Sequence, residues 1–97
     1  MTVIEELQGV IRKPHGVEAT HRESVPVKET WQGKTIWDGV VEVFDLHGHS
    51  QTDTAYAWFH ETDDPNNPLP VTVLHVDPAL SPAKAIRAFI VQEYDNA

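Results

Sequence analysis

The chain has 97 residues, a formal net charge of −8 at pH 7 and no cysteine. This length is typical of one domain and suffices to bury a hydrophobic core, whereas the lack of cysteine excludes disulfides, thiolate metal sites and a cysteine nucleophile. No lysine or arginine occurs from Thr35 to Ala83, and because phosphate backbones are bound by basic residues, this region is not expected to bind nucleic acid. No apolar run approaches a membrane span, and the first residues, with Glu5 and Glu6, do not resemble a signal peptide, so we expect a cytoplasmic protein that does not bind membranes.

The N-terminal segment predicts a short helix followed by a linker. Thr2 and Glu5 have the spacing of a capping box, and apolar residues recur at helical intervals through residues 2–12. Residues 13–24, KPHGVEATHRES, are polar and contain proline and glycine, so they are expected to form a linker. Residues 1–24 are therefore predicted to precede the main domain.

Alternating and β-branched residues next predict an antiparallel sheet. Gln32 and Gly33 separate the first two strands, and glycine supplies the positive φ that a two-residue hairpin turn needs. The second strand has apolar side chains on both faces and is expected to be central, with Gly39 at a bulge. The predicted strands cover residues 25–31, 34–46, 52–61 and 70–77.

A helix is predicted after the last strand. Ser81 has the character of an N-cap and Pro82 suits the first helical position. The apolar stripe of this helix consists of Ile86, Phe89 and Ile90. Residues 25–97 are thus predicted to form an α+β domain, an antiparallel four-stranded β-meander with a C-terminal helix packed on one face, and the short N-terminal helix precedes it.

The two faces of residues 54–60 differ in a way that bears on function. Ala55 and Ala57 are small and lie beside Phe59, so we expect the C-terminal helix to pack there in a two-layer domain. The opposite face would then expose large aromatic residues, which are typical of protein interfaces. The alternative is that these aromatic residues pack in the core. The predicted partner-binding residues are Tyr56, Trp58, His60 and Trp31.

Two segments of this sheet resemble a group of small uncharacterised bacterial proteins. The segments are WQGKTIWDGVVEVFDLHGH and AYAWFH. The shared pattern is W-x-G-x-x-x-W-x-G-x-V-E-V-F-x-L-x-G-H with a following A-Y-A-W, and the resemblance extends over about residues 25–90. It implies a bacterial, cytoplasmic, single-domain protein and no activity, because none is attached to that group.

Three histidines form an alternative candidate site. His47 and His49 are two residues apart, and His60 on a neighbouring strand would complete a face that suits zinc. The pair sits at a turn beside Gly48, however, and no longer zinc motif occurs, so a surface turn is the preferred interpretation. Ser50 lies close in sequence to His49, but neighbours in a turn seldom form a catalytic triad.

We therefore predict a small acidic protein-interaction module without a catalytic site or a cofactor. Its acidic composition favours a basic protein partner, and self-association as a homodimer is the other partner considered. A histidine-based metal protein or enzyme that uses His47, His49 and His60 is the alternative function.

Overall fold

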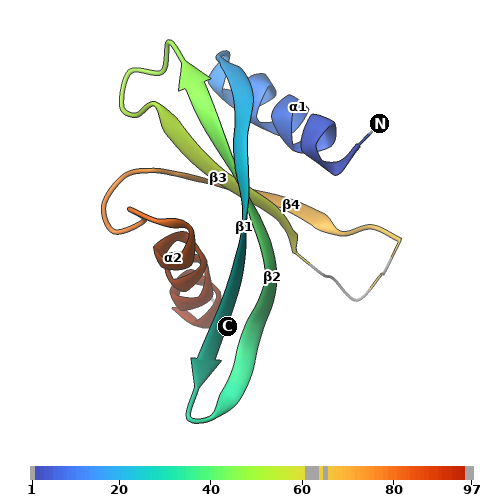
Figure 1. Cartoon of the computed structure of the whole chain (residues 1–97), viewed down its shortest axis with the longest axis vertical. Helices are drawn as coiled ribbons and strands as arrows, with labels where there is room; N and C mark the ends of the chain where they lie inside the picture. Colours follow the sequence, from blue (N-terminus) through green and yellow to red (C-terminus); the bar gives the residue numbers. More distant parts are fainter. Residues whose placement is uncertain (1, 61–63, 65, 96–97) are drawn as a thin grey trace.

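The computed structural model describes residues 2–60, 64 and 66–95, which form four strands between two helices (Figure 1). In chain order the elements are α1 (Val3–His15), β1 (Glu18–Trp31), β2 (Lys34–His47), β3 (Thr54–His60), β4 (Leu69–Leu74) and α2 (Pro82–Asp95). The strands form one antiparallel sheet in the order β1-β2-β3-β4, which confirms the predicted α+β meander with a C-terminal and a short N-terminal helix. Within the described residues, neither helix has the length and apolar character needed to cross a membrane.

Both helices begin at the side-chain caps that the sequence predicts. The amide of Glu5 donates a hydrogen bond to Thr2 Oγ1 at 3.2 Å, and the amide of Lys84 donates to Ser81 Oγ at 3.1 Å. Amides in the first turn of a helix have no intrahelical acceptor, so these caps determine where each helix starts.

The predicted linker, residues 13–24, is wrong. The helix α1 continues to His15 and ends at Gly16, which adopts the left-handed conformation with φ of 63°. The strand β1 already begins at Glu18. The segment is polar because β1 is an edge strand, in which Ala19 is buried while its neighbours on both sides are exposed.

A bulge in β1 exchanges the faces of this strand. The register with β2 shifts between His21 and Glu23, which leaves Arg22 as an extra residue. One extra residue reverses the alternation of side chains. Ala19 consequently packs on the side of α1, whereas Val27, beyond the bulge, packs on the side of α2.

Two hydrophobic cores lie on opposite faces of the sheet. The core beneath α2 contains Val27, Val41, Val43, Tyr56, Trp58, Ala79, Ala85 and Ile86. The core beneath α1 contains Leu7, Ile11, Ala19, Phe44, Leu46, Ala55 and Ala57, and Phe59 packs against it. The prediction that the C-terminal helix covers the alanine face of a two-layer domain is therefore wrong, because α1 covers that face and the domain has three layers.

The aromatic rings explain why α2 takes the other face. The Trp58 ring makes T-shaped contacts with Trp37, at a centroid distance of 6.1 Å, and with Phe89 of α2, at 5.5 Å. Large rings of this kind contribute more buried apolar area than alanine. The alanine face instead receives Leu7 and Ile11 of α1, which are fully buried.

Gly39 does not mark a bulge, contrary to the prediction. It pairs in register with Val27, and the second register shift of the hairpin lies elsewhere, between Glu29 and Thr30. A Cβ atom at Gly39 would lie 3.0 Å from the Trp37 ring. Glycine therefore allows the Trp37 indole to lie directly over the strand and to pack against the core beneath α2.

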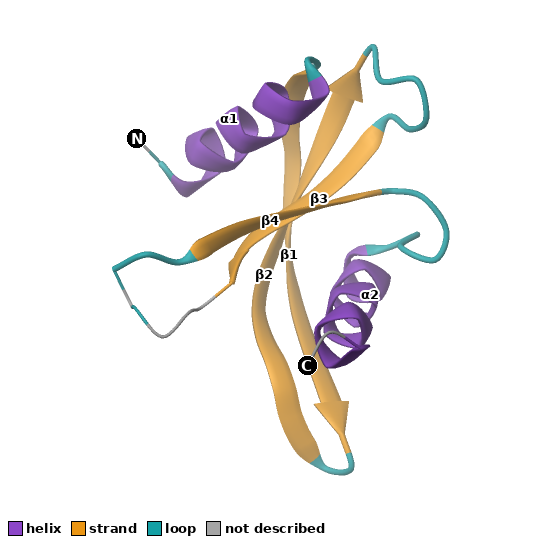
Figure 2. Ribbon diagram, turned by 180° about the vertical axis from the view of Figure 1, so that it is seen from behind, coloured by secondary structure: helices purple, strands orange, loops and turns teal. Residues whose placement is uncertain are grey.

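The long hairpin extends beyond the rest of the sheet (Figure 2). The strand β2 pairs with β3 only from Glu42, opposite Ala57, to Asp45, opposite Thr54. Its pairing with β1, in contrast, continues down to Lys34. Among the described residues, residues 34–41 of β2 consequently have β1 on one side and an open edge on the other.

Candidate functional site

The structure separates the predicted partner-binding residues into buried and exposed ones. Tyr56 and Trp58 are only 4% and 2% exposed, because α2 covers them. The predicted exposure of these two residues is wrong, and the alternative that they are core residues is confirmed. His60 is half-buried, with its ring 5.0 Å from that of Phe89. Trp31, in contrast, is 65% exposed.

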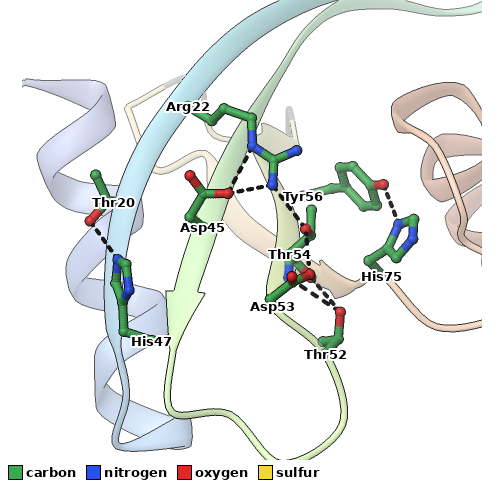
Figure 3. A network of polar contacts seen from close by, with 9 residues as sticks. All are labelled: Thr20, Arg22, Asp45, His47, Thr52, Asp53, Thr54, Tyr56 and His75. Atoms are coloured by element: carbon green, nitrogen blue, oxygen red, sulfur yellow. Dashed lines mark hydrogen bonds and ion pairs between the residues drawn. The ribbon is translucent and has the colours of Figure 1, made fainter.

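The three histidines of the alternative metal site lie in separate surroundings. His47 Nε2 is 3.0 Å from Thr20 Oγ1 on β1 (Figure 3). His49 Nδ1 accepts the amide hydrogen of the residue two positions later, at 3.1 Å, within the β2–β3 loop. His60 packs against Phe89 of α2. Among the residues that the structure describes, no three histidine or carboxylate side chains form a cluster that could hold a metal ion.

A polar network joins three strands near the β2–β3 loop (Figure 3). Arg22 donates to Asp45 Oδ1 through Nε at 2.8 Å and to Thr54 Oγ1 through Nη2 at 3.1 Å, and the bond with Asp45 raises the pKa of Arg22. The Tyr56 hydroxyl lies 2.5 Å from His75 Nδ1. Burial raises the pKa of Tyr56, and the charge of Arg22 opposes this in part. The network thus holds the bulge of β1 against β2 and β3, which is a structural role.

A second polar cluster combines serine, histidine and glutamate, which no sequence pattern indicates. The Ser24 hydroxyl donates to Glu42 Oε1, and His21 Nε2 lies 2.9 Å from the same oxygen and 3.4 Å from Ser24 Oγ. In a catalytic triad, the imidazole joins nucleophile and acid through its two different nitrogens. Here one nitrogen faces both groups and the serine donates to the carboxylate itself. The cluster therefore satisfies the buried Glu42 and does not activate Ser24.

Large apolar side chains are exposed at the free end of the β1–β2 hairpin and on the adjoining side of α2. Trp31 is 65% exposed, Ile36 38% and Val91 58%. Together with Ile90 they line a hollow of about 360 Å³. We call the three residues Trp31, Ile36 and Val91 the hairpin-end surface.

A cleft adjoins this surface where β2 and β3 separate. It has a volume of about 550 Å³ and is lined by residues 35–40 of β2 and by Phe59 and His60 of β3. Ile36 lines both the cleft and the hollow beside Trp31, so the two depressions adjoin at this residue. Asp38 contributes the carboxylate of the cleft lining.

Sequence reasoning found only one residue of this surface, Trp31. Ile36 lies in a predicted strand with apolar side chains on both faces, a pattern that indicates burial. Val91 lies beyond the predicted apolar stripe of α2. A tryptophan beside a hairpin turn was the only local signal. No protein-family model, curated protein or solved structure matches this chain.

Proposed function

We propose that the protein is a non-enzymatic protein-interaction module that binds a protein partner at the hairpin-end surface. The observation that carries the proposal is the exposure of Trp31 beside Ile36 and Val91, around a hollow of about 360 Å³. Single exposed apolar residues are ordinary on a protein surface, but a contiguous group that includes tryptophan is typical of a binding site.

The walls of the hollow are held together before any partner binds. Arg87 Nε of α2 donates to Glu29 Oε1 of β1 at 2.5 Å, which ties the helix to the hairpin. Ile90 and Val91 lie one turn further along the same helix. A preformed site avoids part of the ordering entropy that binding otherwise costs.

The polar clusters of the described residues support a role in binding rather than catalysis. Ser24, His21 and Glu42 are bonded in an arrangement that leaves the serine unactivated, as described above. Tyr56 and His75 are engaged with each other. The net charge of −8 further supports a partner with basic residues around its apolar contact.

The proposal can be tested by photo-crosslinking in cells that naturally produce the protein. A photoreactive phenylalanine derivative placed at position 31 should crosslink a discrete partner, because it keeps an aromatic ring at the most exposed residue of the hairpin-end surface. The matched control carries the same amino acid in place of Val3, which is also exposed, at 55%, but lies on α1. A second variant, Val91→Asp with the photoreactive group at position 31, should lose the crosslinked product.

Products that appear equally from positions 31 and 3, or that persist in the Val91→Asp background, would contradict the proposal. The variants should retain the far-ultraviolet circular dichroism of the parent protein, since exposed positions contribute little to stability. Loss of crosslinking can then be assigned to the surface itself.

A further inference from the structure

We infer that residues 35–41 of β2 bind an extended basic peptide segment as an added strand; this inference rests on the proposed interaction function and names the chemistry of the partner. The first observation is the open edge. The pairing of β2 with β3 ends at Glu42 and Ala57, while the pairing with β1 continues to Lys34. An antiparallel strand with one neighbour directs the amides and carbonyls of alternate residues to its free side, so this edge offers backbone groups to a further strand.

This edge also lacks the proline and lysine residues that occur in the other edge strands of the sheet. The outer edge strand β1 contains Pro26 and the exposed Lys28, and the other edge strand, β4, contains Pro70. Proline and lysine discourage the pairing of edge strands with other chains. Residues 35–41, TIWDGVV, contain neither. The register shift between Glu29 and Thr30 leaves Ile36 as an extra residue, so the regular part of this edge, residues 37–41, is the part suited to strand addition.

The cleft beside this edge follows β2 over residues 35–40. Seven residues of a strand span about 20 Å, at about 3.3 Å per residue. Phe59 and His60 form the opposite wall of the cleft, whose volume is about 550 Å³. Strand addition in such a cleft derives affinity from backbone hydrogen bonds and specificity from alternate side chains.

Charge and apolar exposure identify the chemistry of the added segment. Asp38 and Val40 are two residues apart on one strand, and both are exposed. Side chains two apart on a strand lie on the same face, so a peptide with a basic and an apolar residue two positions apart can pair with both. Lys28 of β1 lies opposite Asp38, but a strand added on the other side of β2 would lie about 10 Å from it, two strand spacings away. Asp38 would thus stand between two basic positions, and the net charge of −8 favours a basic segment at longer range.

The first test measures the binding of short synthetic peptides to the purified full chain. The probe is a capped peptide of seven residues, Thr-Val-Thr-Lys-Thr-Val-Thr, in which lysine and valine stand two positions apart, and its control has glutamate in place of lysine. The lysine peptide should shift the amide signals of residues 35–41, 59 and 60 in NMR spectra. It should bind at least about tenfold more tightly than the glutamate peptide at low salt, because its charge is complementary.

Two further measurements separate strand addition from simple charge attraction. Methylation of one alternate set of peptide amides should abolish binding, while methylation of the other set should leave it unchanged, because an added strand uses only alternate amides. Asp38→Lys should weaken binding about five- to tenfold. Glu23→Lys, an exposed position on β1, makes the same change in net charge and should have a smaller effect.

Equal effects of the two methylated peptides, or of the two lysine variants, would overturn the inference. A homodimer that protects residues 35–41 from hydrogen exchange in the absence of peptide would overturn it as well, since a second copy would then occupy the edge. A partner that crosslinks from position 31 while no peptide shifts residues 35–41 would leave the proposed function standing and refute only strand addition.

Discussion

Replacement of Trp58 by alanine should lower the free energy of unfolding by about 3 kcal/mol. The ring is 2% exposed and lies between Trp37 and Phe89. Truncation of a buried tryptophan to alanine typically costs about 3–5 kcal/mol. The lower end of this range applies because Trp58 Nε1 has no hydrogen-bond partner among the described residues. An unsatisfied buried donor destabilises the folded state by about 1–3 kcal/mol, and truncation to alanine removes this penalty.

Trp58→Phe and Trp31→Ala are control variants whose losses in free energy of unfolding are compared with that of Trp58→Ala. Phenylalanine retains a large ring and removes the unsatisfied donor, so it should cost less than about 1.5 kcal/mol. Trp31 is 65% exposed, and its replacement by alanine should change the free energy of unfolding by no more than about 0.5 kcal/mol. For a domain of this size, a loss of 3 kcal/mol corresponds to a fall in Tm of about 15 °C.

The assay is equilibrium unfolding in urea, followed by far-ultraviolet circular dichroism because the substitutions alter tryptophan fluorescence. The midpoint and slope of each transition yield the free energy of unfolding. Similar losses for Trp58→Ala and Trp31→Ala, or a larger loss at Trp31, would refute the reasoning, since α2 would then not cover the Trp58 face.

Three further predictions concern the two cores. Burial raises the pKa of Tyr56 above 10.0. Because the unfolded chain ionises more readily than the folded protein, the stabilisation from the protonated hydroxyl is complete below about pH 10 and is lost as the pH rises further. The free energy of unfolding, measured in urea between about pH 8 and 11, should show this decline, and Tyr56→Phe should reduce the decline. Gly39→Ala should lower the free energy of unfolding by about 1 kcal/mol and weaken the near-ultraviolet circular dichroism, because the new Cβ would lie 3.0 Å from the Trp37 ring. Leu7→Ala should lower the free energy of unfolding by about 3 kcal/mol, since the Leu7 side chain is fully buried between α1 and the sheet. A loss below about 1 kcal/mol would show that α1 is not a structural layer.

The sequence by itself determined the features that depend on neighbours along the chain. Thr2 and Ser81 mark the helix starts because a cap needs only a side-chain oxygen within hydrogen-bonding distance of the next turn. Gln32 and Gly33 mark the hairpin turn, where both residues have positive φ, at 52° and 79°. The apolar side chains on both faces of residues 34–46 then identify β2 as an inner strand of the meander.

The tertiary structure alone decided which helix covers which face of the sheet. Both faces of β3 are apolar, so the alternation around Ala57 and Trp58 is compatible with α2 on either side, and the choice depends on the ring contacts with Trp37 and Phe89. The bulge at Arg22 also could not be predicted, because a single extra residue leaves no compositional trace and yet reverses the face of every residue beyond it in β1. For the same reason only Trp31 of the proposed interaction surface could be identified from the sequence. The rest of that surface arises where β2 and β3 separate and α2 approaches the hairpin, and these are contacts between residues far apart in the chain.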